Sequence, residues 1–156
     1  MSGMEQPFAV RRLNPPAWLL MTIVIMVLLH FACPVRRLIP PPWTWIGLLP
    51  FLGGAALTIR AAGLFDRAGT PKKPFERSTS LVLDGPYRFT RNPMYLGMVT
   101  GLFGLAILLG SLSPFALPPL FAWFIQARFI VHEEAMMERL FGAEYVAFKG
   151  RVRRWL

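Results

Sequence analysis

The sequence predicts an all-α integral membrane protein with about four transmembrane helices, a cytoplasmic loop and an amphipathic C-terminal helix. Three observations support this fold class. The 156 residues are 54% hydrophobic and only 16% charged, whereas soluble domains average about 25% charged residues. The apolar residues form runs long enough to cross a bilayer, and the basic residues lie between those runs. The length predicts one domain over residues 1–156.

Four apolar stretches follow one another along the chain. Residues 17–35 contain no charged side chain, and as a helix they extend roughly 29 Å, close to the thickness of a hydrocarbon core. The next stretches cover residues 43–63, 94–112 and 115–131. We expect close helix–helix contacts in the third stretch because small residues recur there, at Gly97, Gly101 and Gly104.

The first stretch has an alternative interpretation. Arg11 and Arg12 followed by an apolar run resemble a secretory signal peptide, and Cys33 after Ala32 resembles a lipoprotein cleavage site. Pro34 and the later apolar stretches favour a retained membrane span. Within that span we expect His30 to hydrogen-bond a neighbouring helix.

The basic residues predict the orientation in the membrane. The formal charge is +9, which suits either nucleic acid or an anionic membrane surface. All Lys and Arg residues except Arg36, Arg37 and Arg60 lie before the first stretch, in loop 65–92 or from residue 128 onward. With four spans these segments share one side, so the termini and the loop are expected in the cytoplasm. Topology alone explains the charge, and we expect no nucleic-acid partner.

The C-terminal region is predicted to be helical. Apolar residues recur at helical spacing over residues 132–149, and Gly142 is expected to divide this region into two short helices. The basic residues that follow suit an anionic leaflet, with Trp155 at headgroup depth.

Two segments carry polar groups next to apolar stretches. Residues 85–97 combine turn, aromatic and basic residues directly before the third stretch, and His132, Glu133 and Glu134 stand where the fourth stretch ends. Adjacent carboxylates near a membrane require partners. These partners are either a charged ligand or nearby arginines in a purely structural pairing.

Both segments resemble one known family. The block GPYRFTRNPMYLG at residues 85–97, followed by EEAMMERLFGAEYVAFKGRV at 133–152, is similar to the isoprenylcysteine carboxyl methyltransferases. That family is related to the membrane phospholipid methyltransferases. Gly69, Thr70 and Pro74 resemble the family's lead-in, so the resemblance covers roughly residues 65–152.

The resemblance implies an enzyme that uses S-adenosylmethionine, with no metal. The cofactor would lie between the last two spans and the cytoplasmic segments, in a pocket closed by the C-terminal helix. A cationic sulfonium suits aromatic faces and a carboxylate. By motif match, the cofactor contacts would be Thr79, Ser80, Leu81, Val82, Tyr87, Asn92, Pro93, Met94, Tyr95 and Glu133.

The acceptor is less defined. A lipophilic small molecule, a lipid or a prenylated substrate fits the resemblance, and the substrate-side candidates are Arg91, Arg128 and His132. This chain departs from the prenylcysteine enzymes at Asn92, where they have His, and at Phe129, where they have a substrate-binding Arg. The catalytic residues, if any, are not indicated.

Structural and functional alternatives remain open. Tyr87 and Tyr95 would also suit the interfacial aromatic belt, and Pro93 would suit the first turn of a helix. Glu134 and Glu138 are expected to be solvated or paired with arginine rather than catalytic. A sterol-reductase-like NADPH enzyme is disfavoured because phosphates repel the Glu133–Glu134 pair. A non-enzymatic membrane protein is the other alternative.

Overall fold

The computed structural model describes residues 14–69 and 81–156. These residues form helices and connecting segments without a strand; an isolated antiparallel bridge joins Arg37 and Ser111. The all-α prediction is confirmed for this part of the chain. The elements in chain order are α1 (Pro15–Ala32), η1 (Trp43–Gly47), α2 (Leu48–Arg67), η2 (Gly85–Arg88), α3 (Pro93–Leu109), η3 (Ser113–Ala116), α4 (Leu117–Ile125), η4 (Gln126–Ile130), α5 (Val131–Phe141) and α6 (Ala143–Arg151).

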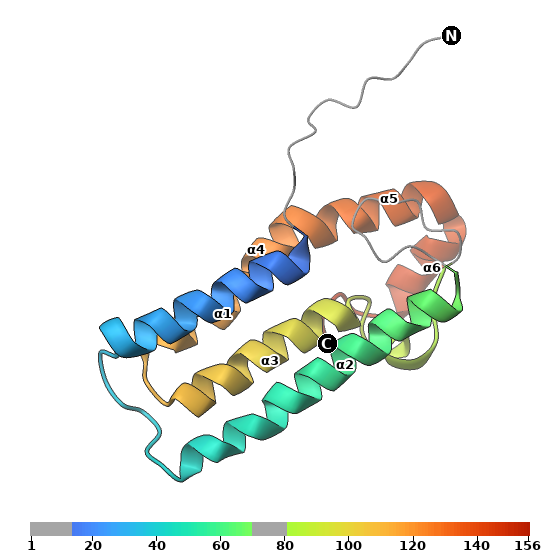
Figure 1. Ribbon diagram of the computed structural model, residues 1–156. Helices are drawn as coiled ribbons and strands as arrows, with labels where there is room; N and C mark the ends of the chain where they lie inside the picture. The colour runs from blue at the N-terminus through green and yellow to red at the C-terminus, as the bar shows by residue number, and fades with distance from the viewer. Residues whose placement is uncertain (1–13, 70–80) are drawn as a thin grey trace.

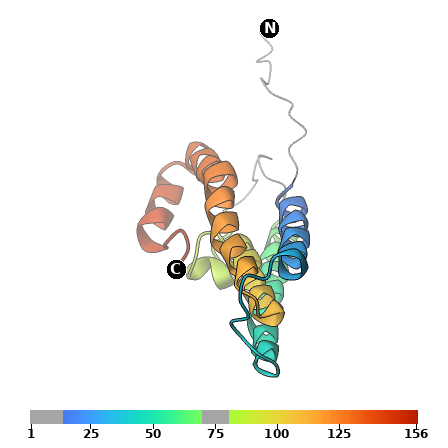
Figure 2. The same cartoon turned by 90° about the vertical axis from the view of Figure 1, so that its left-hand side faces the viewer.

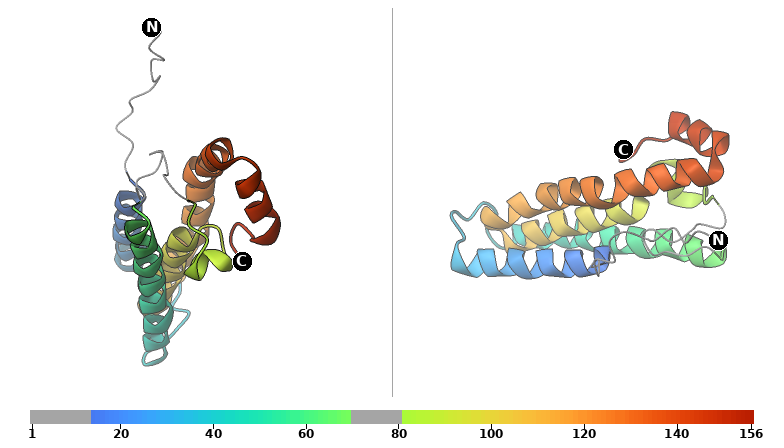
Figure 3. Two further views of the ribbon diagram at one scale, coloured as in Figure 1. Left: turned by 90° about the vertical axis from the view of Figure 1, so that its right-hand side faces the viewer. Right: turned by 90° about the horizontal axis from the view of Figure 1, so that it is seen from above.

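Helix α3 lies at the centre of the fold. It contacts α1, α2 and α4, and successive long helices run in opposite directions (Figure 1). The segments α4, η4 and α5 form one continuous long helix beside α3, as the view from above shows (Figure 3). Because η4 is a π-helical turn, the direction in which side chains project changes midway along this long helix.

Three helical segments are long and apolar enough to cross a membrane, namely Pro15–Ala32, Trp43–Arg67 and Ser113–Phe141. Helix α3 has 17 residues and extends about 26 Å, so it is a shorter apolar helix. The predicted count of four spans therefore stays a prediction. The last segment continues ten residues beyond the predicted end at residue 131, because α5 follows η4 without a break.

The outer surface of the bundle is apolar. Only 11% of the most hydrophobic window of Trp43–Arg67 is buried, and Leu49, Ile59 and Trp123 are among the exposed large side chains. A water-soluble monomer rarely exposes so extensive an apolar surface. This surface fits a hydrocarbon environment, and the protein is an integral membrane protein by the length and composition of its helices.

Glycines allow α2 and α3 to pack backbone to backbone. A methyl group added to Gly97 would collide with Thr58 and the Gly54 carbonyl, and one added to Gly104 would collide with the backbone of Phe51. Thr58 Oγ1 also donates to the Met94 carbonyl at 3.1 Å. The close approach expected from Gly97 and Gly104 is therefore present, and it fixes the start of α3 against α2.

The opposite end of the bundle is joined by polar contacts. His30 Nδ1 and Ser111 Oγ lie 2.7 Å apart and share a hydrogen bond. Ser111 lies in the connection between α3 and η3, so the expected hydrogen bond forms with a connecting segment and not with a neighbouring helix. The Leu38 N–H donates to the Gly110 carbonyl at 2.8 Å. The segment after α1 is thereby attached to the end of α3.

The C-terminal helices lie at the end of the bundle where α3 begins. Gly142, with φ +53°, separates α5 from α6, so the predicted division into two helices is confirmed. Helix α6 then folds back beside α5 (Figure 2). The end of α2, the segment η2 and the final residues of the chain meet at this same end (Figure 3).

Candidate functional site

A tyrosine–glutamate contact joins α3 to α5. Pro93 begins α3 at a position where a proline costs no helical hydrogen bond, and Tyr95 follows in the first turn. The Tyr95 hydroxyl donates to Glu133 Oε1 at 2.8 Å. Tyr95 is 7% exposed and belongs to the main apolar cluster of the bundle. The polar contact therefore stands at the end of that cluster, next to apolar side chains.

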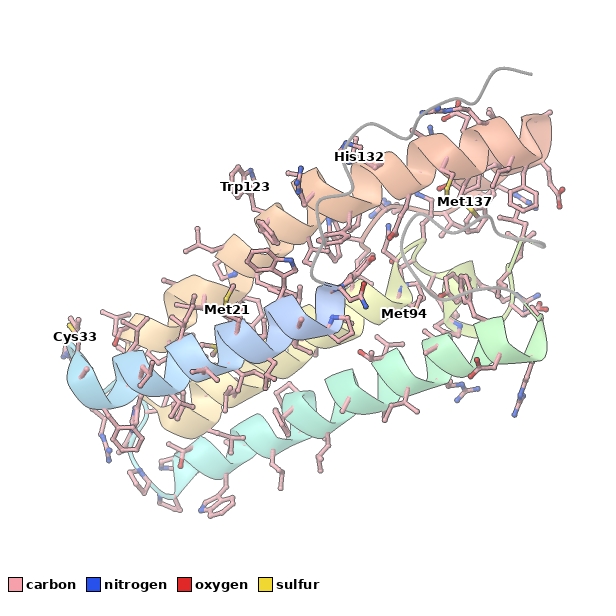
Figure 4. The ribbon with its side chains drawn as sticks, turned by 45° about the horizontal axis from the view of Figure 1, so that its top comes forward. Met21, Cys33, Met94, Trp123, His132 and Met137 are labelled. Carbon is pink, nitrogen blue, oxygen red and sulfur yellow. The ribbon has the colours of Figure 1, made fainter. Side chains whose placement is uncertain are left out.

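The π-helical turn η4 precedes this glutamate. Phe129 and Ile130 are buried in the same cluster as Tyr95, whereas Arg128 is exposed. Figure 4 shows His132 and Trp123 on the side of the long helix that faces away from α3. The substrate-side candidates Arg128 and His132 thus do not join the Tyr95–Glu133 contact.

Tyr87 is the third member of this group. It lies in η2, is 5% exposed, and packs against Phe65 of α2 with ring centroids 5.6 Å apart. Burial, and then the charge of Glu133, raise the pKa of Tyr87 above its usual value, so its hydroxyl stays protonated. Among the described residues this buried hydroxyl has no hydrogen-bond partner. Tyr87, Tyr95 and Glu133 therefore converge, and one polar atom is available to a ligand.

The adjacent carboxylate has a different role. Glu134 is 6% exposed; its Oε2 lies 2.8 Å from Arg154 Nη2 and its Oε1 lies 3.3 Å from Arg91 Nη2. Pairing with arginine, one of the two expected alternatives, is confirmed for Glu134. Arg91, a substrate-side candidate, is thus engaged with Glu134, although its buried Nε has no partner in the described part of the chain.

Residues near the C-terminus contribute contacts that sequence reasoning missed. Asn92 Nδ2 donates to the Arg154 carbonyl at 3.0 Å, and Thr90 Oγ1 donates to the same oxygen at 3.1 Å. Asn92 was expected to contact the cofactor, but its side-chain N–H donates to the protein backbone at Arg154. The signal was weak because Arg153 and Arg154 lie in a basic run that suits a membrane surface equally well.

Trp155 makes contacts within the fold that the sequence did not predict. Its ring packs against the apolar cluster, and its Nε1 donates to Gln126 Oε1 at 2.7 Å. An indole N–H seeks a partner when it is buried, and Gln126 supplies one. Trp155 is therefore attached to the long helix, and its position at headgroup depth stays a prediction.

The remaining candidates are distributed as follows. Leu81 and Val82 are half-buried ahead of η2, whereas Thr79 and Ser80 lie outside the described residues. Pro93 is buried at the start of α3, and the Met94 carbonyl accepts the hydrogen bond from Thr58. Within the described ranges, no group of three or more His, Cys, Asp or Glu residues could hold a metal ion.

The group fits a small cationic cofactor. Glu133 offers a carboxylate, Tyr87 and Tyr95 offer aromatic rings, and the unpartnered Tyr87 hydroxyl can donate or accept a hydrogen bond. A sulfonium and an ammonium group favour these partners. The donor set therefore matches S-adenosylmethionine, the cofactor expected from the two motif blocks.

An apolar groove of about 250 Å³ lies between α1 and α2, with α3 as its floor. Helices α1 and α2 both pack against α3, and the groove between them is partly open to the surroundings of the bundle. Its lining includes Leu19 and Ile23 of α1, Ala55 and Thr58 of α2, and Gly97 and Leu102 of α3. Leu102 also belongs to the cluster that contains Tyr95, so the groove and the polar group share one side of α3.

Comparison with known proteins gives one family. The sequence model described as phospholipid methyltransferase matches residues 42–144, about two thirds of the chain, from η1 into the start of α6. This match includes Tyr87, Tyr95 and Glu133. No curated protein and no solved structure matches the chain.

Proposed function

The chain belongs to the phospholipid methyltransferase family, and from this premise we propose that it transfers a methyl group from S-adenosylmethionine to a lipophilic acceptor at the cytoplasmic membrane face. The family makes the chain a membrane methyltransferase. The cofactor, the acceptor and the sidedness are the proposed part. One observation carries it: Tyr95 and Glu133 are hydrogen-bonded at 2.8 Å beside a buried tyrosine hydroxyl without a partner.

Each residue of the group has a distinct task. Glu133 neutralises a positive charge of the cofactor. Tyr95 holds the Glu133 carboxylate in place through its hydrogen bond. The ring and hydroxyl of Tyr87 contact the cofactor from η2. Bound S-adenosylmethionine supplies an activated methyl group on sulfur. The protein positions the acceptor for in-line attack and excludes water, which lowers the barrier by orientation rather than by a new covalent intermediate.

The groove between α1 and α2 supports an acceptor with a hydrocarbon chain. It is lined by apolar residues and is partly open to the surroundings of the bundle. A chain of the acceptor in this groove would direct its polar end toward the start of α3, where Tyr95 stands. A phospholipid amine and the carboxylate of a prenylated cysteine are the two acceptor chemistries to compare. Arg91, already paired with Glu134, retains an unpartnered Nε that can contact an anionic group.

The distribution of charge supports a cytoplasmic site. Within residues 14–69 and 81–156, most Lys and Arg residues belong to the segments at the end of the bundle where α3 begins. The positive-inside rule places such segments in the cytoplasm. S-adenosylmethionine is polar and reaches the site from that side, whereas the acceptor enters from the bilayer. We treat residues 1–156 as one domain for this activity.

The test combines binding with transfer. The purified protein should bind S-adenosylhomocysteine in calorimetry, and should transfer a labelled methyl group to an acceptor in vesicles. Phosphatidylethanolamine vesicles and vesicles with a farnesylated cysteine distinguish the acceptor chemistries. A protein that binds neither S-adenosylmethionine nor S-adenosylhomocysteine would contradict the proposal.

A further inference from the structure

We propose that Glu134 is a positioning residue that fastens the C-terminal strap (residues 153–156) across the start of α3 and thereby aligns Tyr95 with Glu133. This inference rests on the proposed function for its effect on cofactor binding. The fastening itself is a property of the chain alone. The two adjacent glutamates then have different roles: Glu133 contacts the ligand, and Glu134 binds the strap.

The first step is the contact between Glu134 and Arg154. Arg154 Nη2 donates to Oε2 at 2.8 Å, and Arg154 Nε donates to Oε1 at 3.1 Å. Two parallel hydrogen bonds between a guanidinium and a carboxylate are strong and directional. The pairing raises the pKa of Arg154 above its usual value. Glu134 is also close to Arg91, so its removal would leave two arginines without their shared carboxylate.

The second step is the course of the strap. The Arg153 carbonyl accepts a hydrogen bond from the Arg91 N–H at 2.9 Å. The Arg154 carbonyl accepts hydrogen bonds from Thr90 and Asn92, and Trp155 is anchored to Gln126. Successive strap residues are therefore bound to the segment before α3 and to the long helix.

The third step connects the strap to the site. Residues 90–92, which the strap holds, immediately precede Pro93 and the first turn that carries Tyr95. Glu134 is the residue after Glu133. Both sides of the Tyr95–Glu133 hydrogen bond are thus attached to one network of contacts. Sites in which supporting residues fix the orientation of the binding groups lose affinity when that support is removed.

A second ion pair provides a matched control. Glu138 Oε2 lies 2.8 Å from Lys149 Nζ and joins α5 to α6, with 44% of its side chain exposed. It stands on the same helix as Glu134, one turn further along, but touches no strap residue in the described contacts. Glu138→Gln therefore removes an ion pair of α5 without loosening the strap.

The first measurement is limited proteolysis with trypsin, read by intact mass. The carbonyls of Arg153 and Arg154 are at the bonds that trypsin would cut, and both are hydrogen-bonded in the structure. Cleavage after Arg153 or Arg154 should be about tenfold faster in Glu134→Gln than in the wild type, and unchanged in Glu138→Gln. Equal cleavage in Glu134→Gln and wild type would overturn the proposal, whatever the protein binds.

The second measurement is the affinity for S-adenosylhomocysteine in the full chain, in Glu134→Gln, in a chain that ends at Val152, and in both changes combined. Each single change should weaken binding about tenfold, as is typical for residues of one salt-bridge network. The combined change should weaken it no further, because both remove the same support. If Glu134→Gln does not fold, the affinity of the chain that ends at Val152 still tests whether the strap supports binding.

Additive effects would overturn the proposal, because Glu134 would then act on the binding site by a route other than the strap. Wild-type protein that binds no S-adenosylhomocysteine would instead contradict the proposed function. Proteolysis would then still decide whether Glu134 fastens the strap. The two failures are therefore distinguishable.

Discussion

Replacement of Glu133 by glutamine tests the central contact of the site. Glutamine retains an oxygen that can accept the Tyr95 hydrogen bond, which measures 2.8 Å, so the packing of α3 on α5 should survive. Only the negative charge is lost. A hydrogen bond to a charged group contributes about 1.5–3 kcal/mol. A loss of about 2 kcal/mol corresponds to a roughly thirtyfold higher Kd.

The assay is titration calorimetry with two ligands, S-adenosylmethionine and S-adenosylhomocysteine. If Glu133 faces the ammonium group, both ligands should lose affinity equally, whereas a carboxylate that faces the sulfonium should affect S-adenosylmethionine more. Glu138→Gln is the control, because its pair with Lys149 is partly exposed and contributes little. Unchanged affinity for both ligands in Glu133→Gln would refute the assignment of this residue.

Three further predictions concern the surroundings of the site. The pKa of Tyr87 is raised, so its neutral hydroxyl contributes its full stability below about pH 10 and less as the pH rises. Tyr87→Phe should therefore lose less thermal stability between pH 8 and pH 11 than the wild type. An identical loss in the two proteins would contradict the role of this hydroxyl. Gly104→Ala should destabilise the protein by about 1–3 kcal/mol because of the α2–α3 contact, whereas Gly63→Ala, where the added methyl group meets nothing within 4 Å, should not; thermal unfolding distinguishes the two. Ala55→Phe should obstruct the groove and raise KM for a lipid acceptor without a change in the Kd for S-adenosylhomocysteine; equal KM values would remove the groove from the acceptor's path.

The sequence predicted the helical fold well because its signals are local. Apolar runs and charge asymmetry are visible along the chain, and the described helices begin within two residues of the predicted starts for residues 17–35 and 94–112. The end of the fourth stretch was predicted less well. The predicted end at residue 131 followed the change in polarity, but helix hydrogen bonding continues through the polar residues of α5.

The site was predictable only in part. The motif blocks indicated Tyr87, Tyr95 and Glu133, which the structure brings together. They did not indicate that Glu134 pairs with Arg154, because the two residues lie 20 positions apart along the chain and meet only through the course of the final residues. The contact of Trp155 with Gln126 was hidden for a similar reason, since Gln126 is 29 residues away along the chain.

The π-helical turn has a consequence for insertions and deletions. A π turn contains one residue more than an α turn, so the long helix holds a surplus residue between Phe121 and Glu133. Loss of one residue there, for example the exposed Ala127, would convert the turn to α-helical geometry and leave the flanking segments in phase. A deletion within α5, after the glutamates, falls in regular α-helix with no extra residue. It would rotate the following residues by about 100° about the helix axis. Length variation in this protein should therefore be tolerated at residues 126–130 and selected against immediately beyond them.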